Sequence, residues 1–434
     1  MLIKQLKGAV FNNAVWLLLD KALRIILKFT TSIIVANYVG VDFYGELNYV
    51  ISVNLLVFSL ASFGLSGIVV REFIKSRYSK QEILSNSLSL RIFGSILSLI
   101  VLFIVTRFFH AFEVSTAHLL LIFALGYAFT SFDILDFWFQ SKLNSKPATI
   151  VRMGSFVLIS LSQIIAVYLE TKFTTFVAIM SSEYFLVALI YILLVAGSSD
   201  LRISLKVNLE IIQYLLKQSW PLIISGIGAI IYLKIDVIML KEMMGTEPVG
   251  VYAVAVQFSE LWYFIPVALG SSFFPKMVEV SGTDAFEKKT QGYIAIMILI
   301  SLIIAIGVSL LGPYVIQQFY LPSYWQAGSV LLIHIWASIF IFIRQVFSKW
   351  LIACDLTKYS LHSQLFGALV NVVLNLIFIK SLGLYGAAMA TLVSYASSSV
   401  FILFLTKDLR PFAYLIFKAI SSPVVSIKYA IHND

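Results

Sequence analysis

The chain has 434 residues, of which 60% are hydrophobic and only 12% are charged, and its formal net charge is +9. Soluble proteins carry about 25% charged residues, so this composition excludes an ordinary soluble enzyme and predicts a polytopic, all-α membrane protein. A single cysteine, Cys354, excludes an internal disulfide and a multi-thiolate metal site.

Twelve apolar runs predict membrane spans, each of which needs roughly 20 residues. They cover residues 14–37, 44–69, 83–106, 117–140, 150–169, 175–197, 219–240, 250–273, 293–312, 327–349, 363–380 and 386–405. Short connections separate them. We therefore expect two six-helix bundles around a central cavity, residues 1–217 and residues 218–434, the second with a short cytoplasmic tail.

Two glycines spaced by five residues follow the first span of each half. They are Gly40 and Gly45 in the first half, and Gly245 and Gly250 in the second. A pair of turn glycines alone is weak evidence. Together with six spans on each side, the spacing favours two parallel repeats, as in transporters whose halves are related by an axis normal to the membrane.

The distribution of positive charge predicts the orientation. If the N-terminus is cytoplasmic, 21 lysines and arginines fall on the inner side, four on the outer side and six within spans. Positive residues concentrate in cytoplasmic loops. Both termini are therefore expected in the cytoplasm.

The first span carries an unusual polar stripe. At 100° per residue, Asn13, Asp20, Arg24, Lys28 and Thr31 lie within about 80° of one another, and Lys21 lies at the edge of that arc. A charge at the centre of a span costs roughly 2.5–3.5 kcal/mol on insertion scales. The stripe must therefore face protein or water rather than lipid.

Further charges lie in the other spans, and two interpretations are open for them. In one, they form internal ion pairs, such as Asp20 with Arg24 or Lys234 with Asp236. In the other, basic residues outnumber their acidic partners, and the surplus lines a wet, cationic cavity that takes an anion. The second interpretation makes anion-binding candidates of Lys21, Arg24, Lys28, Arg91, Lys234 and Arg344.

Three other titratable residues are candidates for ion coupling. They are Asp133, Asp236 and His334, because intramembrane carboxylates and histidines can exchange protons or hold a cation. Asn371 and Asn375, spaced i,i+4 in the eleventh span, favour hydrogen bonds between helices over substrate contact.

Several chemical signatures are missing from the sequence. There is no phosphate-cradling glycine loop, no metal-ligand cluster and no nucleophile motif. We therefore expect no catalytic residue, metal, cofactor or nucleic-acid partner, and transport that is downhill or coupled to H⁺ or Na⁺. A large external loop, which a glycan polymerase or glycosyltransferase would need, is also missing.

Three segments resemble one family, the polysaccharide flippases of the multidrug/oligosaccharidyl-lipid/polysaccharide exporter superfamily. The first begins with Trp220-Pro221 and continues through the Ile-Asp-x-x-Met-Leu run at 235–240 to Gly245, Gly250 and Tyr252. The second runs from Gly367 through Asn371 and Asn375 to the Gly-x-x-Gly-Ala-Ala-x-Ala-Thr run at 383–391. The third is Asp136-Phe-Trp-Phe-Gln140 at the end of the fourth span.

The resemblance implies both a fold and a substrate. The fold is two six-helix bundles around a cavity that opens alternately to either side. The substrate is an undecaprenyl-diphosphate-linked oligosaccharide, turned from the inner to the outer leaflet of the bacterial inner membrane for O-antigen or capsule assembly. The bilayer and the polysaccharide polymerase machinery are the other expected partners. A diphosphate suits the basic candidates named above.

Two alternative functions stay open. A multidrug exporter of the same superfamily would have the same twelve spans, but the basic surplus opposes export of cationic drugs. From another class of function, a membrane-bound glycan polymerase or glycosyltransferase would show enzymatic activity. The lipid II flippases are similar but carry about two additional spans.

Overall fold

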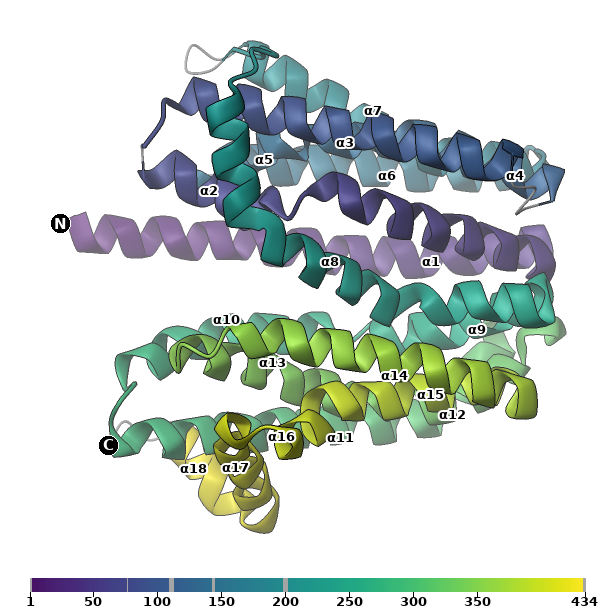
Figure 1. Cartoon of the computed structure of the whole chain (residues 1–434). Helices are drawn as coiled ribbons and strands as arrows, with labels where there is room; N and C mark the ends of the chain where they lie inside the picture. The colour runs from purple at the N-terminus through teal and green to yellow at the C-terminus, as the bar shows by residue number, and fades with distance from the viewer. Residues whose placement is uncertain (1, 76, 109–112, 143–144, 198–201, 432–434) are drawn as a thin grey trace. The chain divides into compact units, whose positions relative to one another are not determined.

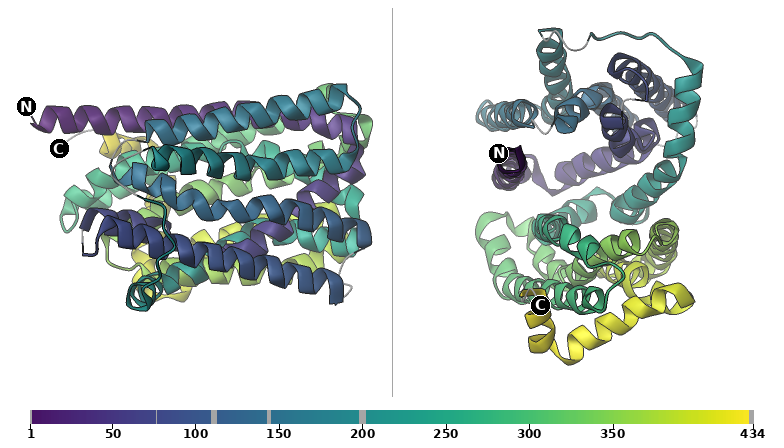
Figure 2. Two further views of the ribbon diagram at one scale, coloured as in Figure 1. Left: turned by 90° about the horizontal axis from the view of Figure 1, so that it is seen from above. Right: turned by 90° about the vertical axis from the view of Figure 1, so that its left-hand side faces the viewer.

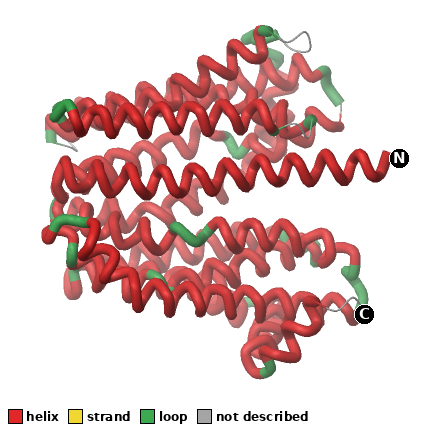
Figure 3. Tube along the Cα trace, turned by 180° about the vertical axis from the view of Figure 1, so that it is seen from behind, coloured by secondary structure: helices red, strands yellow, loops and turns green. Residues whose placement is uncertain are grey.

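The computed structural model describes residues 2–75, 77–108, 113–142, 145–197 and 202–431, apart from the side chains of residues 2–20, 22, 284 and 431. Throughout these residues every regular element is a helix (Figure 3). The predicted all-α fold is confirmed.

Ten helices in the described ranges are long and apolar enough to cross a membrane. The number is eleven if Pro322–His334 and Ala337–Ala353, which meet at 45°, form one broken span. The first of the ten, Leu23–Lys75, has 53 residues and would measure about 80 Å if straight, against a hydrocarbon core of about 30 Å. Because it is interrupted at Gly40, it contains two of the twelve predicted spans.

The chain folds as two compact units, Met1–Ile230 and Ile231–Asp434. The boundary between these units falls within one helix, Leu209–Met244. The boundary between the two six-span halves, expected after residue 217, stays a prediction. The helices of the first unit run side by side (Figure 1). Their bounds are α1 (Leu2–Ser59), a 3-10 turn (Leu60–Ser62), α2 (Leu65–Lys75), α3 (Lys80–Phe108), α4 (Val114–Tyr127), a 3-10 segment (Ala128–Asp133), α5 (Ile134–Ser141), α6 (Lys146–Tyr168), α7 (Phe173–Ala196) and the start of α8 (Leu209–Met244).

The second unit continues from α8 and ends in a pair of short helices. Its elements are α9 (Thr246–Glu260), α10 (Phe264–Glu279), α11 (Asp284–Phe319), a 3-10 turn (Pro322–Tyr324), α12 (Gln326–His334), α13 (Ala337–Ala353), α14 (Lys358–Leu382), α15 (Leu384–Ala396), a π-helical turn (Ser397–Phe401), α16 (Ile402–Leu405), a 3-10 turn (Lys407–Leu409), α17 (Arg410–Ser421) and α18 (Pro423–Ile431). The predicted short tail is therefore helical as far as residue 431.

The glycine repeat has a structural counterpart. Gly40 has φ 82° and ψ 168°, and Gly245 has φ 94° and ψ −171°. This region of backbone space is essentially restricted to glycine. Each glycine ends the first long helix of its half and lets the chain turn into the next, so the repeated spacing encodes a repeated turn.

Breaks in the spans also repeat between the units. The second span of each half is interrupted, at Leu60–Ser62 and at residues 261–263. The fourth span is interrupted in the same way, at Ala128–Asp133 and at residues 335–336. Discontinuous helices at matching positions of two repeats are typical of transporter binding sites. Asp133 is the last residue of one break, and Glu260 and His334 directly precede two others.

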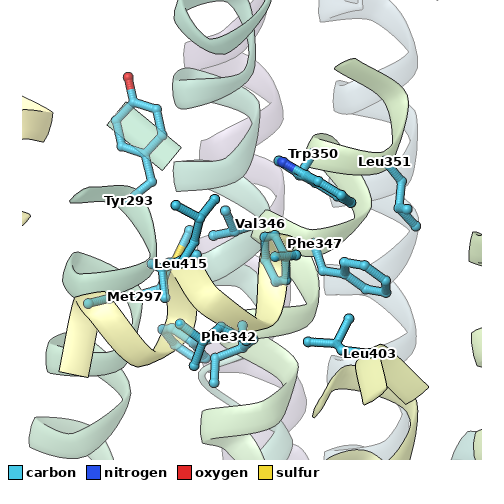
Figure 4. Packing of buried hydrophobic residues seen from close by; sticks show 14 of the residues in the cluster. Tyr293, Met297, Phe342, Val346, Phe347, Trp350, Leu351, Leu403 and Leu415 are labelled. Atoms are coloured by element: carbon cyan, nitrogen blue, oxygen red, sulfur yellow. The ribbon is translucent and has the colours of Figure 1, made fainter. Parts of the chain in front are cut away.

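A large apolar cluster fixes the second unit. Figure 4 shows Phe342, Phe347 and Trp350 of α13 beside Met297 of α11 and Leu415 of α17. Interlocking aromatic and aliphatic side chains gain dispersion energy only when they fit closely. This packing joins the terminal helices to the long ones.

Candidate transport site

Arg24 of α1 forms an ion pair with a carboxylate from another span of the first unit. Its Nη2 lies 2.9 Å from Oε1 of Glu183 on α7, with the two side chains 35% and 15% exposed. The guanidinium also lies over the ring of Phe156 on α6, 4.9 Å from its centroid. Three helices therefore hold Arg24, yet its side chain stays accessible enough to meet a ligand.

Lys28 and Lys21 extend this basic face of α1. Lys28 follows Arg24 by about one turn, and both charges act on Glu183. Lys21 precedes Arg24 by nearly one turn and is exposed. The expected pairing of Asp20 with Arg24 involves a side chain outside the described residues. Two residues before Glu183, the Ser181 hydroxyl donates to the carbonyl oxygen of Ile122 at 2.9 Å and so ties α7 to α4.

Arg91 and Asp133 form a deeper pair of charges in the same unit. Arg91 of α3 is buried, and its charge and that of Asp133 act on one another. The Ser131 hydroxyl donates to the backbone carbonyl of Arg91 at 3.2 Å, which ties the broken fourth span to α3. Within the described residues, Nε of Arg91 has no hydrogen-bond partner.

Asp136 forms a structural ion pair one helical turn beyond Asp133. Its Oδ2 lies 2.6 Å from Nη1 of Arg152 on α6 and accepts a hydrogen bond from Gln140 at 3.0 Å. The internal ion-pair interpretation is thus the correct one for Asp136.

Lys234 in the second unit pairs with Glu260, not with Asp236. Its Nζ lies 3.6 Å from Oε2 of Glu260 on α9. The pair with Asp236, one example of the internal ion-pair interpretation, does not form, because residues two apart on a helix point about 200° apart. Arg24 and Lys234 both have carboxylate partners that the sequence interpretation did not assign, so the basic surplus in the spans is smaller than expected.

Asp236 instead closes a buried network between α8, α9 and α15. Its side chain is 4% exposed. Oδ2 accepts hydrogen bonds from the hydroxyls of Tyr252 at 2.5 Å and Thr391 at 3.3 Å, and Oδ1 accepts one from the backbone N–H of Val237 at 2.8 Å. A carboxylate surrounded by neutral oxygen and nitrogen groups could hold a proton or a small cation.

Polar residues of α12, α14 and α15 continue this network. His334 lies edge-on to the ring of Tyr252, 5.9 Å between centroids, and its Nδ1 has no partner in the described part of the chain. Asn371 donates to Ser394 at 3.1 Å, and Asn375 donates to Asn371 at 3.0 Å. The asparagines therefore connect α14 with α15, as expected.

Arg344 of α13 donates hydrogen bonds to three neutral oxygens, and its guanidinium lies 5.9 Å from the ring centroid of Phe347. Its Nη1 donates to Oγ of Ser363 at 2.8 Å and to the carbonyl of Ser398 at 2.9 Å, and Nη2 donates to the carbonyl of Ser360 at 3.3 Å. Ser398 belongs to the π-helical turn, an element frequent at functional sites. Across the described ranges no carboxylate pairs with Arg344, so no side chain neutralises its charge.

One pocket lies away from all of these residues. Its volume is about 490 Å³, and it is lined by Met243, Met244, Ile379, Lys380 and Gly383 near the C-terminal ends of α8 and α14. None of the charged residues described above lines this pocket.

Two protein families match the sequence. The family described as polysaccharide biosynthesis protein matches residues 10–281, and the MatE family matches residues 221–377. The first match covers more than half of the chain.

Curated relatives come from the archaeon Haloferax volcanii. The probable low-salt glycan biosynthesis flippase Agl15 is 24% identical over 222 residues, which cover 50% of this chain and 47% of the relative. The probable flippase AglR is 27% identical over 176 residues, covering 39% of this chain and 37% of the relative. The matches thus span less than half the length of these relatives.

Solved structures share the fold over nearly the whole chain. An inward-facing multidrug resistance MATE family transporter of the MOP superfamily has a TM-score of 0.71 and 15% identity, covering 93% of this chain and 98% of that one. The lipid II flippase MurJ, in an inward closed conformation, has a TM-score of 0.69 and 15% identity, covering 97% and 96%. These matches are to flippases and transporters rather than to enzymes. The chain belongs to the polysaccharide biosynthesis protein family and has the fold of the MOP-superfamily transporters.

Proposed function

We propose that this protein is a flippase, and not an enzyme, for an oligosaccharide linked to a polyprenyl diphosphate. In a bacterial inner membrane the carrier is undecaprenyl diphosphate, both termini are cytoplasmic, and the flipped unit goes to the polymerase machinery of O-antigen or capsule assembly. The observation that carries the proposal is the set of charged side chains beside matching breaks in the spans of both units. The names of the curated relatives, both flippases, support it.

The basic residues are proposed to bind the diphosphate. Arg24, Lys28 and Arg91 serve in the first unit, with Lys21 at the edge of the group, and Lys234 and Arg344 serve in the second. Hydrogen bonds from guanidinium groups to phosphate oxygens are among the strongest in proteins. An arriving diphosphate competes with Glu183 for Arg24, and the carboxylate takes the guanidinium back when the lipid leaves. Binding is therefore reversible, which turnover requires.

Asp236 is the leading candidate for ion coupling in this proposal, and Asp133 and His334 are the other two candidates. A proton or Na⁺ bound to the Asp236 carboxylate changes its capacity to accept hydrogen bonds from the hydroxyls of Tyr252 and Thr391. Because these partners lie on α9 and α15, occupancy of the carboxylate is transmitted to two helices of the second unit. A change of this kind can bias alternating access.

The leaflet in which the glycan accumulates tests the function. In cells that lack this protein and any redundant flippase, the lipid-linked oligosaccharide is expected to collect on the cytoplasmic leaflet. Wild-type protein should relieve this accumulation, and the Arg24→Ala/Lys28→Ala variant should not. Normal delivery to the outer leaflet without the protein contradicts the proposal.

A multidrug exporter is the second candidate, favoured by the MatE match over residues 221–377 and by the MATE fold. Resistance profiling of a deletion strain separates the two functions. Sensitivity to cationic drugs with unchanged surface glycan would favour the exporter.

A further inference from the structure

The two terminal helices form a hairpin, here called the α17–α18 hairpin, that is fixed to the second unit. α17 runs crosswise to the long helices of that unit (Figures 1 and 2). α18 packs along α11, where Gln291 donates to Ser426 at 2.6 Å. A Cβ on Gly292 would lie 2.6 Å from the carbonyl oxygen of Ser426, so the two helices touch closely.

One face of α17 completes the apolar core of the second unit. Phe412, Leu415, Ile416 and Ala419 are buried in the cluster around Phe347. This face accounts for only half of the apolar residues of the helix.

The opposite face is also apolar and has nothing covering it in the described structure. Tyr414, Phe417 and Ile420 are 55%, 69% and 60% exposed, and Val424 and Val425 of α18 are exposed beside them in sequence. Just before the hairpin, Phe401, Phe404 and Leu405 are exposed on the last predicted span. The apolar surface of that span thus continues in sequence onto the hairpin.

Basic residues accompany this apolar face. Within residues 406–431, Lys407, Arg410, Lys418 and Lys428 accompany a single acidic residue, Asp408. The Tyr359 hydroxyl donates to Asp408 at 2.5 Å. The Nζ of Lys418 lies 4.3 Å from the ring centroid of Tyr414, so a positive charge lies directly against the apolar face. This pattern is typical of helices that lie in a membrane interface.

We propose that the α17–α18 hairpin lies in the interface of the leaflet where the last span ends, with its apolar face among the acyl chains and its basic residues on anionic phospholipid headgroups. Lipid is the occupant because the apolar surface follows that of a span and because the net positive charge complements anionic headgroups. This inference does not depend on what the protein transports.

Depth measurements on the full chain in nanodiscs test the apolar part. In a Cys354→Ser background, a nitroxide at Phe417→Cys should be more accessible to oxygen than to a water-soluble nickel chelate, while one at Lys407→Cys should show the reverse. Preferential access of nickel to position 417 overturns the proposal. Low access of both reagents also overturns it, since that would mean that protein covers this face.

Headgroup preference tests the charged part. The wild-type protein is released from nanodiscs that contain phosphatidylcholine and phosphatidylglycerol, and its bound lipids are identified by native mass spectrometry. It should retain phosphatidylglycerol in preference to phosphatidylcholine. Arg410→Gln/Lys418→Gln should lose this preference, because it removes two of the basic side chains. Arg410 is exposed and Lys418 is partly exposed, so their loss should leave the fold intact. Lys380→Gln, an exposed lysine at the C-terminal end of α14, should keep it. Equal retention by all three proteins contradicts the headgroup assignment.

Discussion

Arg24 shows how a charged side chain can be accommodated in a membrane span and still be useful. An isolated charge at the bilayer centre costs several kcal/mol, and the 2.9 Å pair with Glu183 together with the ring of Phe156 reduces that cost. The side chain nevertheless stays partly exposed. In the proposed function a ligand phosphate replaces the carboxylate as the partner of Arg24.

The contribution of Arg24 to transport can be separated from its contribution to structure. Arg24→Gln should lower the apparent affinity for the lipid-linked substrate roughly ten- to a hundredfold, as loss of a charged hydrogen bond of about 1.5–3 kcal/mol predicts. Glu183→Gln should retain binding, because it removes only the competitor. Both variants are compared by binding and flipping in proteoliposomes.

The double variant Arg24→Gln/Glu183→Gln is the decisive control for that prediction. If the pair is purely structural, removing both charges should restore transport. We expect the double variant to stay as defective as Arg24→Gln, and recovery would count against a substrate role.

Asp236 gives a second prediction at this scale. Tyr252→Phe removes the 2.5 Å hydrogen bond to a buried carboxylate, so it should lower the free energy of unfolding by about 1 kcal/mol. The matched control is Tyr293→Phe, since the buried hydroxyl of Tyr293 has no partner in the described residues and its loss should be close to neutral. Unfolding of the purified protein in mixed detergent micelles measures both, and equal effects contradict the assigned network.

Partner choice is the part of the site that the sequence could not predict. A lone glutamate in an apolar span, Glu183, was itself a detectable signal, but its pairing with Arg24 depends on how α1, α6 and α7 pack. For Lys234, helix geometry alone excludes Asp236 as a partner on the same face, whereas the choice of Glu260 requires the position of α9. Spacing along one helix predicts its faces but not its neighbours.

At the scale of elements, breaks in the helices place the polar residues. Asp133, Glu260 and His334 each lie at the end of a helical segment where a span is interrupted. Backbone groups freed at such breaks can bind ions and polar ligands. The two units repeat these breaks in their second and fourth spans.

The turn glycines provide a test of the repeat. Gly40→Ala and Gly245→Ala should each lower the free energy of unfolding by about 1–3 kcal/mol, because both positions have backbone angles that only glycine adopts readily. A Cβ would meet nothing within 4 Å at either position, so the cost is one of backbone strain and not of collision.

Two helical glycines are the matched controls. Gly226 of α8 and Gly307 of α11 also have nothing within 4 Å of an added Cβ, and alanine favours helix. Their substitution should be neutral or stabilising in the same unfolding assay. If Gly40→Ala behaved like these controls, the turn would not need glycine.

The spans and the turns were predictable, and the breaks were not. Hydropathy located the twelve runs, and the glycine spacing at residues 40 and 245 marked the turns. The segment Ala128–Asp133 contains neither glycine nor proline, so nothing local indicates a 3-10 interruption there. Its position reflects packing against α3 and α7, which the sequence of one segment does not contain.

At the scale of the whole molecule, both units share one plan, with a glycine turn, two broken spans and charges at the breaks. The first unit contains Arg24, Lys28, Arg91 and Arg152 with the carboxylates Glu183, Asp133 and Asp136. The second contains Arg344 without a carboxylate partner in its described residues. In that unit Lys234 pairs with Glu260, while Arg344 and the carboxylate of Asp236 are each held by neutral groups.

The most direct test of the proposed flippase function is a flipping assay with the purified protein in proteoliposomes. A polyprenyl-diphosphate-linked oligosaccharide and a cationic dye are offered to the wild type, to Arg24→Gln/Lys28→Gln and to Lys380→Gln. We predict that the wild type and Lys380→Gln move the lipid-linked sugar, that the double variant is strongly slowed, and that none of them moves the dye. Transport of the dye by the wild type, with the lipid-linked sugar left in its original leaflet, would contradict the account.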